Sequence, residues 1–212
     1  MGCSVVLGVS MTRLACLRRN LPPELRKETY VTGATQFRMV CTAFDYRVPS
    51  RSLTVVGCLE VIGEALEVSM QSSSACNRQS YEYRLYDDRE LIDEISSLAI
   101  GASGYDDNIP CLAVVVGKQR AYFNDWDGHA ISIDARLSAM GFQFALETRG
   151  LASCCINWPA IPQNERKMEA LLDLDSDESV VMLMAIGYPD PDGMIPYSEK
   201  KEIESVRSYN DI

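Results

Sequence analysis

Histidine is almost absent from this sequence, which has one, His129, among 212 residues. The eight cysteines include no Cys-x-x-Cys pair and no Cys/His cluster with the spacing of metal ligands. The apolar runs are short, and none approaches the roughly 18 residues that a membrane helix needs. We therefore expect neither a bound metal nor a membrane span.

Basic residues are also scarce, with 20 Lys and Arg against 30 Asp and Glu, a formal charge of −10. No cluster of cations appears that could neutralise a phosphate backbone, so we do not expect nucleic acid as a partner. The apolar stretch at residues 4–17 is interrupted by Arg13 and follows no basic residue, unlike an export signal. We expect a cytoplasmic protein with reduced cysteines.

What the sequence does have is the composition of a folded protein, with 47% hydrophobic and 24% charged residues. Its length suits one domain with a short extension. Residues 1–45 sustain no hydrophobic period, and we treat them as an N-terminal extension of unknown structure. Residues 46–212 form the expected domain.

Hydrophobic periodicity predicts four helices and four strands in this domain. The longest helix is apolar nearly all round and is expected to be buried, with Gly150 as its stop and Asp134 as a cap rather than a catalytic base. Helices are expected over residues 55–70, from Asp87 or Asp88 to Ala99, from Ser132 or Asp134 to Arg149, and over 161–174. Strands are expected over residues 81–85, 111–117, 152–158 and 179–189.

The elements alternate along the chain, but no Gly-x-Gly-x-x-Gly motif follows the first strand. This pattern favours an α+β fold over a dinucleotide-binding Rossmann unit. We expect a central sheet of four or five mostly antiparallel strands flanked by helices.

Two kinds of residue could suggest catalysis. His129 lies near Asp125 and Asp127, which leaves a hydrolase conceivable, although a single His beside Gly in a polar turn is more often a surface or capping residue. Cys76 has only Arg78 nearby to lower the pKa of its thiol, so we expect it to be packed rather than reactive.

A six-residue motif is more specific. Ser74-Ala75-Cys76-Asn77-Arg78-Gln79, between a predicted helix and a strand, resembles the signature of the FMN-dependent nitroreductase family, Pro-Ser-x-x-Asn-x-Gln-Pro-Trp. Three later segments are similar to this family in order and spacing. They are the long helix followed by "GLASCCINW", the strand "SVVMLMAIGYPD" and the tail "PYSEKKEIE".

The resemblance covers residues from about Arg47 to Tyr209 and implies a nitroreductase-like fold that binds FMN. An Asn side chain offers both a donor and an acceptor, so Asn77 suits the pyrimidine edge of a flavin, with Gln79 or Arg78 nearby. The implied cofactor-binding set from the motif is Ser74, Ala75, Cys76, Asn77 and Gln79.

The segment after Gly150 is the second part of the implied site. The backbone N–H groups of Ala152, Ser153 and Cys154, preceded by Leu151, could face flavin N5 and O4 and stabilise negative charge there. No side-chain acid or base is then required.

The flavin phosphate needs cations. Arg47 and Arg51 have a spacing compatible with the family's phosphate-binding arginines, and Arg38 offers a rival alignment. Lys200 or Lys201 would add a further charge from the C-terminal tail.

The resemblance implies a homodimer with FMN between the subunits and hydride transfer from NADH or NADPH through flavin N5 to an electron-poor acceptor, such as a nitroaromatic or a quinone. The motif details are most similar to a branch found beside polysaccharide-biosynthesis proteins. Pro49, Ser73 and Ser80-Tyr81 depart from the pattern, so the alternative is a flavin-binding or interaction module without turnover.

Overall fold

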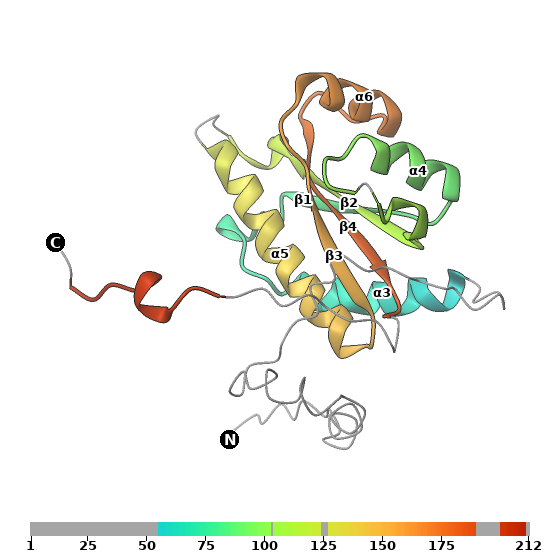
Figure 1. Cartoon of the computed structure of the whole chain (residues 1–212). Coiled ribbons are helices and arrows are strands. Elements are labelled where there is room, and N and C mark those ends of the chain that lie inside the picture. The colour runs from blue at the N-terminus through green and yellow to red at the C-terminus, as the bar shows by residue number, and fades with distance from the viewer. Residues whose placement is uncertain (1–54, 103, 124–126, 190–199, 211–212) are drawn as a thin grey trace, which may run out of the picture.

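A four-stranded antiparallel sheet forms the centre of the molecule (Figure 1). The computed structural model describes residues 55–102, 104–123, 127–189 and 200–210. The strands lie in the order β1-β2-β4-β3, which confirms the predicted α+β class; the expected boundary at residue 46 lies outside the described residues. Their bounds are β1 Tyr81–Tyr86, β2 Cys111–Lys118, β3 Ala152–Asn157 and β4 Glu178–Gly187.

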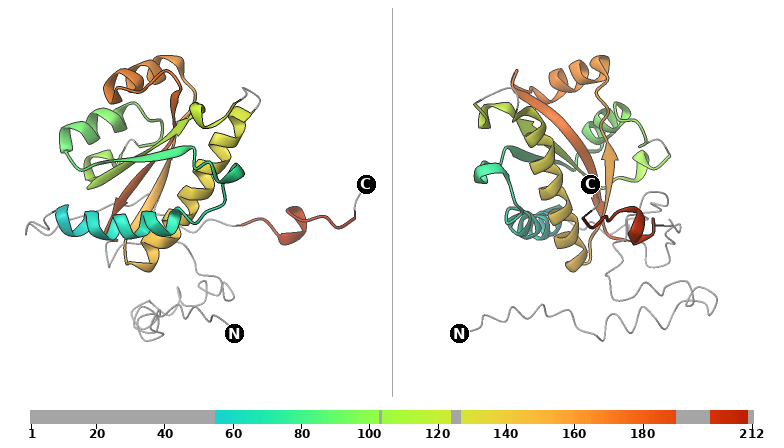
Figure 2. Two further views of the ribbon diagram at one scale, coloured as in Figure 1. Left: turned by 180° about the vertical axis from the view of Figure 1, so that it is seen from behind. Right: turned by 90° about the vertical axis from the view of Figure 1, so that its left-hand side faces the viewer.

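Helices cover both faces of this sheet (Figures 1 and 2). One face packs against α3 (Val55–Ser69) and α5 (Gly128–Thr148). The other packs against α4 (Arg89–Ser97) and α6 (Pro162–Leu172). Short 3-10 turns connect these elements: η1 Ala75–Asn77, η2 Asp106–Asn108, η3 Gln119–Ala121 and η5 Ile203–Ser205.

The central strand β2 is buried on both sides, as its unbroken apolar run predicts. Successive side chains of a strand point to opposite faces, so its residues divide between two cores. Cys111, Ala113 and Val115 join the core beneath α3 and α5. Leu112, Val114 and Val116 join the core beneath α4 and α6.

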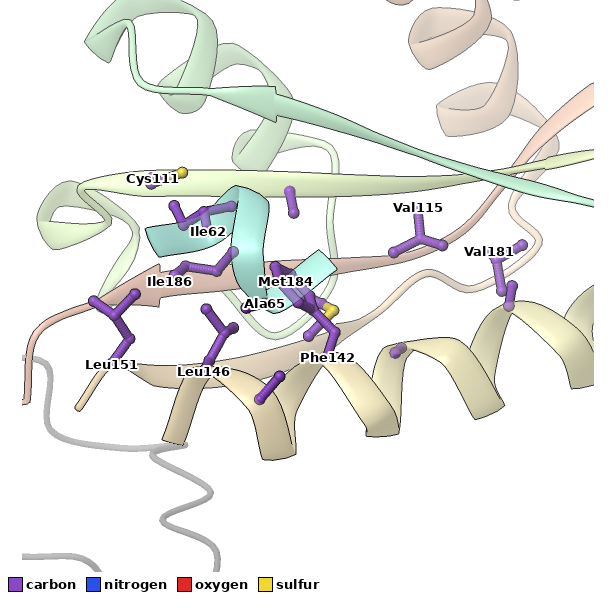
Figure 3. Packing of buried hydrophobic residues seen from close by; sticks show 14 of the residues in the cluster. Ile62, Ala65, Cys111, Val115, Phe142, Leu146, Leu151, Val181, Met184 and Ile186 are labelled. Carbon is purple, nitrogen blue, oxygen red and sulfur yellow. The ribbon is translucent and has the colours of Figure 1, made fainter. Parts of the chain in front are cut away.

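The long helix α5 packs on the sheet through one stripe of its surface. Phe142 and Leu146 point toward Met184 and Ile186 of β4 (Figure 3). The approach is close at Gly117 of β2, where an added Cβ would lie 2.4 Å from Cγ2 of Ile131. A larger residue at 117 would therefore force Ile131 to shift.

The bounds of α5 differ partly from the prediction. The helix begins at Gly128, earlier than Ser132 or Asp134, and Asp127 is its N-cap residue. It ends at Thr148, and the predicted stop is confirmed because Gly150 has a left-handed φ of 78° and Leu151 N–H donates to Leu146 O at 3.0 Å.

The expectation that α5 is buried all round is wrong for a single chain. Ile133, Leu137, Met140 and Phe144 are between 38% and 52% exposed. They recur at three- and four-residue steps, so they form one apolar stripe on the side of α5 away from the sheet. We call these four residues the outer stripe of α5.

Asp88, rather than Asp87, caps α4, since its Oδ1 accepts from Leu91 N–H at 3.0 Å. Residues 200–210 are exposed, and they lie apart from the sheet and the helices in Figure 1 and in the left view of Figure 2. Within the described ranges, no helix is both long enough and apolar enough to cross a bilayer.

A small polar network lies buried between α3, α5 and β1. Ser69 Oγ donates to Ser138 O at 2.9 Å, and its Oγ lies 2.7 Å from Ser138 Oγ. Tyr83 Oη lies 2.9 Å from Ser138 Oγ, and its ring meets Phe142 edge-on at 5.2 Å between centroids. Burial raises the pKa of Tyr83 from 10.0 to about 12.

This pKa predicts a loss of stability in alkali. The folded protein holds the phenolic proton of Tyr83 more tightly than the unfolded chain does, so the stabilisation is complete below pH 10.0 and is lost as pH rises toward about 12. Between these values Tyr83 should lower the free energy of unfolding by about 1.4 kcal/mol per pH unit. Urea unfolding across this range should show a shallower decline for Tyr83→Phe. Tyr209→Phe is the control because Tyr209 is 85% exposed, and equal pH profiles for both variants would contradict the prediction.

Candidate functional site

The motif Ser74–Gln79 forms a tight loop between α3 and β1. It contains the single turn η1, and three of its residues have left-handed backbone conformations: Cys76 with φ 53°, Asn77 with φ 55° and Gln79 with φ 50°. Such conformations cost residues other than glycine about 1–2 kcal/mol each, and they concentrate at functional sites. The surrounding structure must therefore hold this loop in place.

A buried carboxylate on α5 supplies one attachment. Asp134 is 3% exposed, and its two oxygens accept from the backbone N–H of Ala75 at 3.1 and 3.0 Å. Its Oδ2 also accepts from the hydroxyl of Tyr122 at 2.6 Å. Burial raises the pKa of Tyr122, and the hydrogen bond to Asp134 raises it further. The phenol therefore keeps the proton that it donates.

The segment 119–123 supplies the other attachments. Arg78 Nη1 donates to Ala121 O at 2.6 Å, and the guanidinium lies over the rings of Tyr122 and Phe123, 5.3 and 4.9 Å from their centroids. Next to it, Ser80 Oγ donates to Tyr122 Oη at 3.4 Å. Tyr122 therefore connects the loop, its following residue and Asp134.

The residues just before the loop also run close along α5. An added Cβ at Gly141 would lie 2.5 Å from Ser72 Oγ and 3.6 Å from Ser69 Cα. The small residue at 141 thus lets the end of α3 and the start of the loop approach the helix.

The loop presents amide side chains to the outside. Asn77 and Gln79 are exposed, and Gln79 Nε2 donates to Asn77 Oδ1 at 3.2 Å. Ser74 Oγ is half-buried and accepts from Gln79 N–H at 3.3 Å. With its Oδ1 accepting from Gln79, the Asn77 amide still has its NH2 group as a donor for a ligand. Ala75 is exposed in the same loop. The expectation that Cys76 is packed is wrong, because the left-handed turn leaves this residue exposed as well.

The second predicted part, Leu151 to Cys154, lies where α5 turns into β3. Its side chains are buried. β3 is an edge strand of the described sheet and pairs on one side with β4. Alternate backbone N–H groups of an edge strand point away from its partner, so this segment retains donors that could meet a ligand.

Within one chain, the structure does not bring these two parts together. The loop is attached at Asp134, whereas Leu151 follows the far end of α5 at Thr148. A helix rises about 1.5 Å per residue, so Asp134 and Thr148 are separated by roughly 20 Å along its axis. The strand pairing shows the same separation. Lys118 N–H, at one end of β2, donates to Ser80 O, whereas Ser153 pairs with the same β4 residue, Ile186, as Cys111 at the other end of β2. One flavin ring system cannot reach both parts in a single copy.

Only two of the cations predicted to bind the flavin phosphate lie within the described residues. Arg38, Arg47 and Arg51 lie outside the described residues. Lys200 and Lys201 are exposed in the C-terminal segment, which lies apart from both the loop and the start of β3 (Figures 1 and 2).

Asp134 is the residue whose role the sequence reading missed. We expected a helix cap, but α5 begins six residues earlier and the carboxylate attaches the loop instead. A signal was available, because Asp134 lies on the helix face of Ile131, Ala135 and Ser138, where a lone carboxylate needs buried partners.

The described residues give less support to a hydrolase centred on His129 or to a metal site. His129 is exposed in the first turn of α5, and its neighbour Asp125 lies outside the described residues. Across the residues that the structure describes, no group of three or more His, Cys, Asp or Glu side chains could hold a metal ion.

Comparisons with known proteins show a similarity to the nitroreductase family. The model of the nitroreductase family matches residues 106–188, and the curated proteins contain no match. An FMN-dependent nitroreductase from Clostridium difficile is 21% identical with a TM-score of 0.60, covering 72% of this chain and 88% of its own. NfrA2 from Bacillus megaterium is 20% identical with a TM-score of 0.62, and the match covers 72% of this chain and 66% of NfrA2.

A third structure, assigned as an NADH dehydrogenase/NAD(P)H nitroreductase from Parabacteroides distasonis, is 18% identical with a TM-score of 0.62, covering 72% of this chain and 86% of its own. At these identities the structural likeness establishes the fold, and the family model adds a sequence match from η2 to the end of β4. The chain therefore has a nitroreductase-like fold, and its residues 106–188 match the model of the nitroreductase family.

Proposed function

We propose that this chain is an FMN-dependent oxidoreductase that passes hydride from NADH or NADPH, through bound FMN, to an electron-poor acceptor such as a nitroaromatic or a quinone. The observation that carries the proposal is the loop Ser74–Gln79. Three of its residues are in strained left-handed conformations, and it presents the amides of Asn77 and Gln79 outward. Strain of this kind is retained where a loop has to meet a ligand.

The donor and acceptor groups suit a flavin. The pyrimidine edge of FMN presents two carbonyl oxygens and an N–H, which the amide of Asn77 can pair with. The outward N–H groups near Ala152 to Cys154 provide donors for the region of N5 and O4. FMN supplies the redox chemistry, accepting and donating hydride at N5. The task of these residues is to bind and orient the ring and to stabilise the charge that develops on it.

A complete site of this kind needs two copies of the chain. The loop and the start of β3 lie at opposite ends of α5, so a two-fold axis that pairs α5 with its copy in antiparallel orientation would bring each loop toward the other copy's β3. Two equivalent flavin sites would result, each with one part from each subunit. The separation within one chain thus supports the expected homodimer.

The outer stripe of α5 supports the same assembly. Ile133, Leu137, Met140 and Phe144 place exposed apolar side chains along the helix on the side that the sheet does not cover. Contiguous exposed apolar surface of this kind marks an interaction site. An antiparallel helix pair would bury this stripe in both copies at once.

The assignment of NADH or NADPH as reductant draws on the similar structures. One is named an FMN-dependent nitroreductase and another is assigned as an NADH dehydrogenase/NAD(P)H nitroreductase. Their names support the redox class, whereas the acceptor of this chain stays open among nitroaromatics, quinones and the unknown substrate of the polysaccharide-associated branch.

The phosphate of FMN would be met by cations from outside the loop. Arg47 and Arg51, or Arg38 in the rival alignment, are our candidates, with Lys200 or Lys201 from the C-terminal segment. Lys200 and Lys201 are exposed, so they would have to approach a flavin held by another part of the assembly.

The function is tested by the flavin spectrum of the purified protein. We expect a yellow protein, or a colourless one that turns yellow with added FMN, whose visible absorbance bleaches when NADH or NADPH is added without oxygen. Protein that takes up no FMN would refute the proposal. Bound FMN that neither nucleotide bleaches would instead support the flavin-binding module without turnover.

The role of Asn77 is tested by truncating its amide. Asn77→Ala should leave polar atoms of the bound flavin without partners, a loss of about 1–3 kcal/mol that raises the Kd for FMN roughly 5- to 150-fold. Asn108→Ala is the matched control, because Asn108 is also exposed but lies beside α4 on the opposite face of the sheet. Equal Kd values for both variants would remove Asn77 from the site.

The homodimer is tested by placing a charge in the outer stripe. Leu137→Glu should convert the dimer to a monomer and abolish tight FMN binding, because burial of an unpaired carboxylate in the interface is strongly unfavourable. Ile100→Glu is the control, since Ile100 is 57% exposed at the end of α4 and should keep both properties. Sedimentation and FMN titration measure the outcome, and a monomeric wild type that binds FMN tightly would contradict the shared site.

A further inference from the structure

A carboxylate buried on α5 has no role in the proposed chemistry, yet it contacts the loop that would meet the flavin. Asp134 is 3% exposed and lies among the residues through which α5 packs on the rest of the protein. Burial of a carboxylate is costly unless hydrogen bonds compensate for the lost water. An apolar residue would serve packing alone better, so the explanation for Asp134 lies in its partners.

Those partners all belong to the neighbourhood of the loop. Ala75 N–H donates to both carboxylate oxygens, at 3.1 and 3.0 Å, and the Tyr122 hydroxyl donates at 2.6 Å. Hydrogen bonds to a charged acceptor contribute more to stability than bonds between neutral groups. Asp134 therefore attaches the loop strongly at one backbone position.

The attachment is made directly before the strained residues. Ala75 begins η1, and Cys76 and Asn77 follow it with φ of 53° and 55°. Left-handed conformations are unfavourable for most residues other than glycine, so without an attachment the backbone would relax toward ordinary conformations and turn the amide of Asn77 away.

We propose that Asp134 is a positioning residue for the flavin, which holds the loop Ser74–Gln79 in the conformation that presents Asn77 to the pyrimidine ring. This inference rests on the proposed function and adds a determinant of cofactor affinity that itself touches no cofactor atom. Tyr122 supports Asp134 from the other side and connects it to Ser80 and to the stacked guanidinium of Arg78.

Three substitutions separate positioning from simple stability. Asp134→Asn keeps one acceptor for Ala75 N–H, and Asp134→Ala keeps none. Ser138→Ala is the matched control, because Ser138 lies one turn further along the same helix face, is equally buried and bonds Ser69 and Tyr83 rather than the loop.

The measurements are the Kd values for FMN and for riboflavin, by fluorescence titration of the full chain, and the thermal midpoint from circular dichroism. Asp134→Asn should raise both Kd values by the same factor, roughly tenfold, since the loop serves the ring and not the phosphate. Asp134→Ala should raise them further. Ser138→Ala should lower the thermal midpoint without changing either Kd.

Several results would overturn the inference. Wild-type affinity in Asp134→Asn would do so, and so would a Ser138→Ala variant that loses flavin affinity to the same extent. Should Asp134→Ala not fold, Asp134→Asn and Tyr122→Phe, which removes one bond to the carboxylate, still decide the question. A wild type that binds neither flavin refutes the proposed function itself, whereas a flavin-binding wild type with an unaffected Asp134→Asn refutes only the role of Asp134.

Discussion

The packing of α5 on the sheet is the constraint on which the rest of the molecule depends. Phe142 and Leu146 fix the helix against β4, and Gly117 lets its first turns approach β2 closely. Because α5 is 21 residues long and both candidate binding segments are attached to it, its length determines how far apart they are. The same packing leaves the outer stripe exposed, so one helix defines the core, the spacing of the site and the surface available to a second copy.

The loop after α3 shows how a stable scaffold holds an unfavourable local conformation. Its left-handed residues raise the local free energy, and hydrogen bonds to a buried carboxylate and a backbone carbonyl offset that cost. Such an arrangement gives exposed amides a fixed direction before any ligand arrives. In the proposed enzyme this preorganisation would lower the entropy cost of binding FMN.

Much of the fold could be predicted from the sequence, because hydrophobic periodicity and glycine stops are local signals. The strands at 111–117 and 179–189 and the stop at Gly150 were identified in this way. The motif around Asn77 located the loop, but not its dependence on Asp134, 57 residues further along the chain. The exposure of Leu137 also escaped prediction, because apolar character alone does not tell a residue that packs on the sheet from one that faces away from it.

We propose that a complete flavin site requires two copies of this chain. A crystal structure of the protein with bound FMN tests it most directly. We expect each flavin to lie against Asn77 of one copy and against the backbone near Ala152 to Cys154 of the other, with the outer stripes of the two α5 helices packed together. A flavin bound entirely by one copy, or at a surface away from both segments, would contradict it.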